Sequence, residues 1–449
     1  MRLTFILFLV FINVTAQNIK GIVLDSETNT PIEDANIVID KNNGTSTNNK
    51  GQYFLRLKHN IKSTDTIQFS CIGYSSEKIT YSKLKTLNFI IHLSKKTEVL
   101  NEVTINSKKQ LNNSVTFHKI NRLKNGIHNF GAVLINNKIY IIAGDLTHFI
   151  ETGKKAIDAI SYITEPTTKD FMREFRKNYS WETYSDKLYT FDIVNNTIET
   201  SSIPFRKRAY HTIVNYNNNI YVLGGKRLSD NRLFEYLDDK IEVFNIDSNE
   251  KIIDDTNPHQ AVNFASFSYK DNIIVMGGST KLKNNNTKEF TNTSHIYNIT
   301  TGLWYELPKM TKPKEVNGLI INDKIYLIGG YNNKALTEIE SYNLTTGQWV
   351  KEGNMFEAVE KPALAYNNNI IYIFNEGKII TYDTTTNILD EYKIDLNIAK
   401  AQMFYFNNKL YIIGGYVKFE FEKVNSPDIY VIDLNEFAKT KLQQSKKFS

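Results

Sequence analysis

A short strand that ends on glycine recurs six times in this sequence. The stretch NNNIYVLGGK at 217–226 alternates aliphatic residues with tyrosine and stops on two glycines. Its variants are NNKIYIIAGD at 136–145, KDNIIVMGGS at 270–279, INDKIYLIGGY at 321–331, NNNIIYIFNEG at 367–377 and NNKLYIIGGY at 407–416. An apolar strand and an Asn- or Asp-rich turn come before the glycine-ended strand. A third strand follows it and ends on an apolar residue plus Asp or Asn. The chain therefore repeats one antiparallel unit.

The length of the repeat restricts the fold. Units of about 40–50 residues with four strands each are typical of a β-propeller. One such sheet cannot bury both of its faces, whereas six sheets around an axis bury them against one another. We expect an all-β ring of six blades. A seventh blade within the insertion at 147–185 is a second possibility.

The glycines and aromatic residues have separate expected roles. Glycine allows a positive φ and a close backbone approach where the strand ends beside aromatic side chains of a neighbouring blade. The stretches YNITTGLW at 297–304 and YNLTTGQW at 342–349 place Tyr and Trp on the third and fourth strands. We expect these rings to fill the space between blades.

The repeat resembles the kelch motif: an apolar strand, Gly-Gly, then spaced Tyr and Trp. The match is strongest in RAYHTIVNYNNNIYVLGG at 208–225 and extends over about 130–441. The first copy departs from the pattern with Ala143-Gly144, the fifth has Asn375-Glu376 in place of Gly-Gly, and four of the six lack the Trp. The resemblance implies a kelch β-propeller at 129–441, followed by a short tail at 442–449.

The region before the propeller contains short strands separated by turns. Strand-like runs recur at intervals of about 8–12 residues, which indicates a small β-sandwich or barrel. The stretches GIVLDSETNTPIEDANIVI, TSTNNKGQYFLRL and FSCIGYSSEKI resemble the carboxypeptidase-regulatory-like domain, which has a transthyretin-like fold. The family's recurring positions are Gly21, Pro31, Ala35, Gly51, Phe54, Gly73 and Tyr74. The resemblance implies a non-catalytic accessory module at 17–105.

The first residues indicate export. MRLTFILFLVFINVTAQ has a basic residue, an apolar run and a small-residue cleavage site, so we interpret 1–16 as a signal peptide. The run is too short to span a bilayer in the mature chain. We expect a location in the periplasm or at the cell surface of a Gram-negative bacterium, because the end of the small domain resembles that of outer-membrane transporters of such bacteria.

Two further features concern the linker and the cysteine. The stretch 106–128 carries five basic residues and no acidic one, and we interpret it as a solvated linker. Within it, SVTFHKI at 114–120 alternates apolar and polar residues, which suits a strand of the following domain. Cys71 is the only cysteine, which excludes an intrachain disulfide, and we expect it to be buried.

Several function classes find no support in the sequence. The formal net charge of +6 is mild for 449 residues, and no nucleic-acid-binding motif is present, so nucleic acid is not an expected partner. The eight histidines show no metal-binding spacing. We found no phosphate-binding glycine loop and no nucleophile motif, so we assign no cofactor, no metal and no catalytic residue.

The insertion in the first blade is the main candidate for a binding site. It occupies 147–185, and loops as long as this are usually functional or disordered. Apolar residues at helical spacing predict two helices, the second starting near Pro166-Thr167. This region supplies Arg173, Arg176 and Trp181, and the loop PFRKRAYH on the same face supplies Arg206 and Arg208. Guanidinium groups bind carboxylates and sulfates in a bidentate manner, and Trp can stack on a sugar ring. The alternative is that the arginines are solvated or structural and that Trp181 packs against the blade.

Two hypotheses for function follow. The first is an exported, non-enzymatic protein that presents propeller loops to a protein or glycan ligand, including anionic ligands. The second is a sugar isomerase similar to periplasmic sialic-acid mutarotases, which share a six-bladed kelch propeller. In that case Arg206 or Arg208 would bind the substrate carboxylate, and Glu315, Glu357 or Glu360 would act as acid or base.

Overall fold

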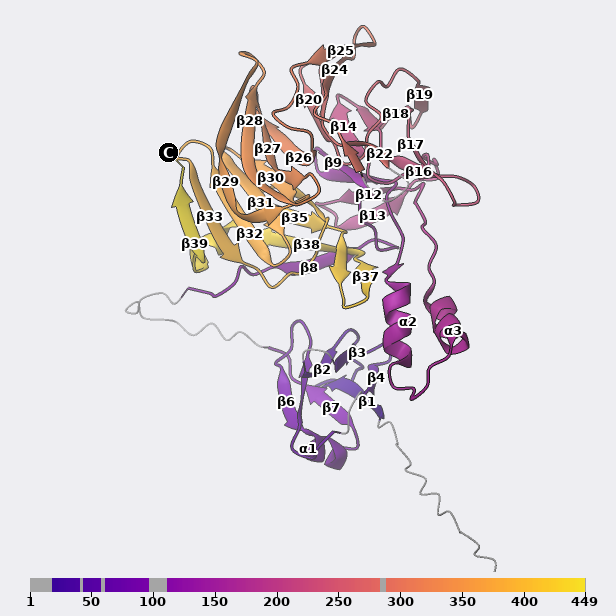
Figure 1. The fold of residues 1–449 in the computed structure, drawn as a ribbon. Coiled ribbons are helices and arrows are strands. Elements are labelled where there is room, and N and C mark those ends of the chain that lie inside the picture. The colour runs from indigo at the N-terminus through magenta and orange to yellow at the C-terminus, as the bar shows by residue number, and fades with distance from the viewer. Residues whose placement is uncertain (1–17, 41–42, 58–60, 97–110, 283–287, 449) are drawn as a thin grey trace, which may run out of the picture. The chain divides into compact units, whose positions relative to one another are not determined.

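The computed structural model describes residues 18–40, 43–57, 61–96, 111–282 and 288–448. The chain forms two compact units, Met1–Lys108 and Lys109–Ser449, both drawn in Figure 1. The predicted signal peptide at 1–16 lies outside the described residues.

The first unit is a small β-sandwich. One sheet has the order β4 (Gln52–Arg56), β1 (Asn18–Asp25), β7 (Ile90–Leu93). The other has the order β3 (Asn43–Ser46), β2 (Asn36–Asp40), β5 (Thr66–Ser70), β6 (Glu77–Thr80), and α1 (Tyr81–Thr86) follows β6. Alternate residues of the strands point inward, as in β4, where Tyr53 and Leu55 are buried and their neighbours are exposed. Both sheets contribute to one apolar core.

Cys71 differs from its expected burial. The side chain packs against the edge of the core but stays partly exposed, and burial raises the pKa of its thiol. The nearby Asp25 is the more deeply buried group. It accepts hydrogen bonds from the backbone N–H of Glu27 and Thr28 and from the Tyr74 hydroxyl, all at 2.9 Å. These bonds, those from the backbone first, hold the pKa of Asp25 well below its usual range.

The second unit is a six-bladed propeller. Each blade is an antiparallel sheet in which successive strands pair as neighbours. The first blade contains β9 (Gly131–Ile135), β10 (Lys138–Ile142), β12 (Leu188–Asp192) and β13 (Thr197–Thr200), and the second contains β14 (Thr212–Tyr216), β15 (Asn219–Leu223), β18 (Ile241–Asn245) and β19 (Lys251–Asp254). The third blade contains β20 (Ala265–Tyr269), β21 (Asn272–Met276), β24 (Ser294–Asn298) and β25 (Leu303–Leu307). The fourth contains β26 (Glu315–Ile321), β27 (Lys324–Tyr331), β28 (Leu336–Asn343) and β29 (Gln348–Val359).

The last two blades borrow strands from both ends of the unit. The fifth has β30 (Ala363–Asn367), β31 (Ile370–Asn375), β32 (Lys378–Asp383) and β33 (Ile388–Lys393), extended by β39 (Gln444–Lys447). The sixth has β34 (Gln402–Phe406), β35 (Lys409–Ile413), β38 (Asp428–Asp433) and, as its outer strand, β8 (His118–Arg122). The predicted linker at 106–128 therefore contains a propeller strand, and the predicted tail at 442–449 contains another. Pairing of β8 with β38 joins the start of the unit to its end.

Apolar side chains close the ring between neighbouring blades. Ile139 of the first blade packs in one cluster with Ile413 of the sixth. The paired glycines sit at these contacts, as expected. A Cβ at Gly224 would lie 2.5 Å from the ring of Phe264 in the next blade, and Gly225 has φ +84°. Within the described residues the ring has six blades, and the insertion does not form a seventh.

The insertion contains two helices, as its spacing predicts. They are α2 (Thr152–Ile160) and α3 (Thr168–Asn178), which lie together outside the blades in Figure 1. Thr167 caps α3: its hydroxyl accepts the N–H of Asp170, whose carboxylate accepts the N–H of Thr167. Two-residue β11 (Phe149–Ile150) precedes α2 and pairs with β37 (Glu422–Asn425).

Further hairpins extend the same connections between the second and third strands of a blade. They are β16 (Lys226–Leu228) with β17 (Glu235–Leu237), β22 (Ser279–Leu282) with β23 (Lys288–Phe290), and β36 (Tyr416–Lys418) with β37. The part of the chain that the structure describes contains no helix long and apolar enough to cross a membrane.

Candidate functional site: the loop face of the propeller

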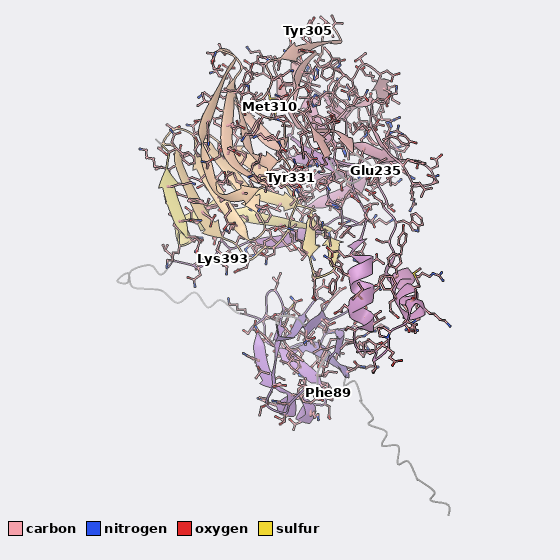
Figure 2. The ribbon with its side chains drawn as sticks, in the orientation of Figure 1. Phe89, Glu235, Tyr305, Met310, Tyr331 and Lys393 are labelled. Carbon is pink, nitrogen blue, oxygen red and sulfur yellow. The ribbon has the colours of Figure 1, made fainter. Side chains whose placement is uncertain are left out.

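The insertion and the basic loop before the second blade lie on one face, as the strand directions predict. The hydroxyl of Tyr210, in that loop, donates to Asp145 at the start of the insertion (3.2 Å). Lys226 pairs with Glu182 at the end of the insertion (3.1 Å) and with Glu235 on the β16–β17 hairpin. Glu235 is labelled in Figure 2. We call the surface formed by these connections the loop face.

Arg208 is buried under the loop face. Its side chain is 0% exposed. The guanidinium lies 3.2 Å from a carboxylate oxygen of Asp238 and 2.9 Å from one of Glu242, and it donates to the carbonyl oxygens of Gly224 and Lys240. Two carboxylates and two carbonyl oxygens surround the guanidinium, so Arg208 holds the blade together and presents no free fork to a ligand. The structure thus gives it the structural role that the sequence left open.

Arg206 is also committed to the protein. Its guanidinium donates to both carboxylate oxygens of Asp238 at 2.9–3.1 Å, and its side chain is largely buried. Lys207, between the two arginines, is exposed, and it has no ion partner among the described residues. Of the three basic residues in this loop, only Lys207 is free to meet a ligand.

The predicted site residues of the insertion are exposed. Arg173 pairs with Asp170 (3.0 Å) and Glu174 (3.1 Å), whereas Arg176 has no ion partner within the described ranges. Trp181 is 52% exposed and meets the ring of Tyr179 edge-on at 5.1 Å between centroids. Trp181 therefore does not pack against the blade, which was the alternative reading of this residue.

Trp181 and the β16–β17 hairpin form an open groove. Trp181, Asp230, Asn231 and Arg232 line a space of about 270 Å³. A second pocket of about 180 Å³ is lined by Glu182, Lys207 and Arg232, among others, and joins the insertion to the basic loop. The exposed residues Tyr179, Trp181, Arg232, Leu233 and Phe234, which lie on or beside this groove, are called the rim patch below.

The centre of the ring holds a channel of about 320 Å³. The innermost strands of all six blades line it. Lys361 lies on the connection that precedes β30, and it lines both the channel and a pocket of about 160 Å³ on the loop face. Its Nζ donates to Oδ1 of Asn263 at 2.9 Å, and the amide of Asn263 donates to Glu315 at 3.1 Å. We call the group formed by Asn263, Lys288, Glu315, Glu360, Lys361 and Lys400 the mouth cluster.

Burial and neighbouring charges shift the pKa values of two lysines in the mouth cluster. Lys400 pairs with Glu360 (2.8 Å), and Lys288 pairs with Glu315 (2.7 Å). Burial, reinforced by Lys400, lowers the pKa of Lys361 to about 8. Burial also lowers the pKa of Lys400, although Glu360 opposes that shift. A perturbed lysine at the opening of a cavity is a recognised sign of a functional site.

The three predicted acid or base candidates separate in space. Glu315 and Glu360 belong to the mouth cluster, each held by a lysine. Glu357 is exposed and pairs with Lys378. Neither Arg206 nor Arg208 has a free guanidinium to bind a substrate carboxylate beside these glutamates. Among the described residues, no group of three His, Cys, Asp or Glu side chains could hold a metal ion.

Comparisons with known proteins agree with this architecture. A family model described as the KLHDC2/KLHL20/DRC7 Kelch-repeats domain matches residues 176–377, and one described as the CarboxypepD_reg-like domain matches residues 19–105. A search of curated proteins finds no match. The solved structure titled "Structure of YjhT" aligns with a TM-score of 0.51 and 13% identity, over 72% of this chain and 99% of that chain. This likeness supports the propeller fold alone. The chain thus contains a Kelch-repeat domain within a six-bladed β-propeller and an N-terminal carboxypeptidase-regulatory-like domain.

Proposed function

We propose that this protein is an exported, non-enzymatic binding protein whose loop face contacts a protein partner through the rim patch. A Kelch propeller supports a protein-interaction or binding role. The observation that carries the choice of surface is the exposure of large apolar side chains beside unpaired cations. Leu233 is 67% exposed, Phe234 59% and Trp181 52%.

Energetic reasons favour a protein at this surface. Burying these three side chains would remove apolar area from water, and Trp, Tyr and Arg dominate the binding energy of many interfaces. Contiguous exposed apolar patches on soluble proteins usually mark interaction sites. Arg176, Lys207 and Arg232 have no ion partner in the described part of the chain, so they suit a partner with acidic groups around an apolar anchor.

The test is a capture experiment with matched variants. The purified full chain, Trp181→Ala and Tyr305→Ala are immobilised and exposed to a surface-protein extract of the source cells. Tyr305 is 53% exposed on β25, away from the rim patch, so it controls for loss of any exposed ring. We expect the wild type and Tyr305→Ala to retain the same specific protein and Trp181→Ala to lose it. Equal capture by all three would remove the rim patch from the account.

The other parts of the proposal have their own checks. A glycan array with the same variants, together with Arg173→Ala/Arg176→Ala, tests the glycan alternative: binding to a sugar that depends on Trp181 would replace the protein partner. The export proposal is supported by the sequence of 1–16. Cell fractionation tests it, and recovery of the uncleaved chain in the cytoplasm would contradict it.

The two arginines that the isomerase hypothesis assigns to the substrate carboxylate are not available for it. Arg206 pairs with Asp238, and Arg208 lies between Asp238 and Glu242, so binding is the function that we propose. We expect the protein not to accelerate anomer exchange of N-acetylneuraminate followed by NMR. Acceleration that disappears in Glu360→Gln would reinstate the isomerase.

A further inference from the structure

The walls of the central channel combine apolar surface with polar groups that already have partners. Leu134, Leu319, Leu364 and Phe404 are among the apolar side chains that line it. Several polar side chains of the wall form hydrogen bonds within the protein. Thr212 and Ser266 share a hydrogen bond, Asn317 donates to the Pro362 carbonyl (2.9 Å), and Gln402 donates to the Phe130 carbonyl (3.4 Å). The wall of the channel is therefore mixed, with apolar side chains lying between polar atoms that make up the larger part of its exposed surface.

One end of this channel carries an excess positive charge. The mouth cluster holds three lysines and two glutamates. Each glutamate is paired with a different lysine, Glu315 with Lys288 and Glu360 with Lys400. Lys361 is the remaining cation, and no carboxylate lies within ion-pair distance of it among the described residues. The cluster therefore has a surplus of one charge beside the cavity.

Lys361 also has unused hydrogen-bonding capacity. An ammonium group has three N–H donors, and the one acceptor it meets in the described structure is Oδ1 of Asn263. Holding a partly buried charge without a counter-ion costs stability. Proteins keep such strained or unpaired groups chiefly at functional sites. A ligand that supplies a negative charge and acceptor oxygens would satisfy both deficits.

We propose that the channel binds a small molecule with one carboxylate, the carboxylate resting on Lys361 and the body lying between the inner strands, where it meets both apolar and polar side chains. A single surplus charge matches a monoanion better than a phosphate dianion. The cavity volume is at the lower end of the range usual for small-molecule sites. This site is separate from the rim patch and does not depend on the protein partner proposed above.

Isothermal titration calorimetry of the purified full chain with 3-phenylpropionate tests the proposal, with 3-phenylpropanamide as the uncharged probe of the same shape. We expect the acid to bind and the amide to bind on the order of tenfold more weakly or not at all. Lys361→Gln should lose the preference for the acid. Lys324→Gln changes an exposed lysine at the start of β27 and should bind as the wild type does.

A pH series separates a direct role of Lys361 from a structural one. The probe remains ionised above neutral pH. Lys361 loses its proton as the pH rises, so affinity for 3-phenylpropionate should fall between pH 7 and 9.5. The charged groups that face Lys361 are Glu315, Glu360, Lys288 and Lys400. The charge of Lys361 also acts electrostatically on His128 and His211. Both histidines stay neutral in this range, since burial first, and nearby cations, lower their pKa values.

Three results would overturn the proposal. They are equal binding of the acid and the amide, unchanged binding by Lys361→Gln, and an affinity that stays constant up to pH 9.5. Circular dichroism and thermal unfolding of Lys361→Gln establish that its propeller is intact. If that variant failed to fold, the pH series and the comparison of acid with amide on the wild type would still show whether the channel binds the carboxylate. Trp181→Ala should bind the probe normally, so failure of the rim patch and failure of the channel are distinguishable.

Discussion

Arg208 and Lys361 are basic side chains at the start of two different blades, yet the protein treats them in opposite ways. Arg208 is fully buried between two carboxylates and two carbonyl oxygens. Lys361 has one amide oxygen and no carboxylate within the described structure. The difference shows that a charge in a propeller loop can be part of the repeat's architecture or available to a ligand, and that its partners decide which.

The role of Arg208 recurs in other blades with different residues. Arg208 donates to the carbonyl of Gly224, the first glycine of its pair, and contacts Glu242 on the third strand. Lys314 does the same with Gly329 and Glu340. In the third blade His259 bonds to the carbonyl of Gly277 (2.8 Å) and to His295 (2.9 Å). One carbonyl at the glycine turn is thus satisfied by a different side chain in each of these blades.

The largest change in the free energy of unfolding should come from removing the buried charge of Arg208. Arg208→Gln breaks two buried ion pairs, although Asp238 keeps Arg206 and Glu242 keeps Lys251 as a partner. Breaking a buried pair costs about 3–5 kcal/mol. Chemical denaturation should show this loss in the free energy of unfolding. Lys207→Gln, one position earlier and exposed, should leave the midpoint unchanged. Equal stability of the two variants would show that Arg208 does not hold the blade together.

The second effect is a loss of stability in acid through the His259–His295 pair. Burial lowers the pKa of His259 to about 4, with the carbonyl of Gly277 opposing the shift, and burial also lowers the pKa of His295. Between pH 6.5 and 4 the unfolded chain binds protons that His259 in the folded chain does not, so stability falls as pH falls. The full loss in the free energy of unfolding that His259 causes over this pH range is about 3 kcal/mol.

Thermal unfolding at pH 7 and pH 4.5 checks this expectation with wild type and His259→Gln. The glutamine amide can still donate to the Gly277 carbonyl but does not titrate. We expect a smaller loss of unfolding temperature in the variant than in the wild type. Parallel pH profiles for the two proteins would assign the acid sensitivity to other groups.

The smallest change in the free energy of unfolding should come from replacing Lys361, and here we expect a gain in stability where Arg208→Gln gives a loss. Lys361→Gln removes a partly buried charge that has no counter-ion, but it also removes the hydrogen bond to Asn263, so the free energy of unfolding at pH 7 should rise by a net amount of about 1 kcal/mol. In the wild type the folded pKa lies below the unfolded value, so the cost is present below pH 8 and is relieved as pH rises toward 10. Denaturation at pH 7 and pH 9.5 should therefore show the variant's advantage shrinking. Destabilisation at pH 7 would make Lys361 a structural residue.

The sequence predicts the blades well because the repeat is local. Each unit carries its own turns and glycines, so six blades and the helices of the insertion follow from patterns within a few tens of residues. The two borrowed strands, β8 and β39, do not follow from such local patterns. β8 pairs with β38 about three hundred residues away, and five basic residues around it resemble a solvated linker. The alternation in SVTFHKI was the signal that a strand lies there.

The candidate site was predictable only in part. Exposure of Arg173, Arg176 and Trp181 follows from their place in a long insertion. The partners of Arg208 could not be predicted, because Asp238 and Glu242 lie thirty or more positions away and reach it only once the blade forms. Lys361 had a usable signal. Asn263, Lys361 and Lys400 each stand two residues before an inner strand, a position that the ring brings to the mouth of the channel.

Lys361 keeps its ammonium group without a carboxylate partner, unlike the cations that build the blades. NMR titration of protein labelled at the lysine Cε measures its pKa directly, with the Lys361 signal assigned by its absence in Lys361→Gln. We expect a pKa of about 8 for Lys361. A value at or above the ordinary lysine pKa, near 10.4, would mean that the group is solvated or paired and that Lys361 is not an available cation.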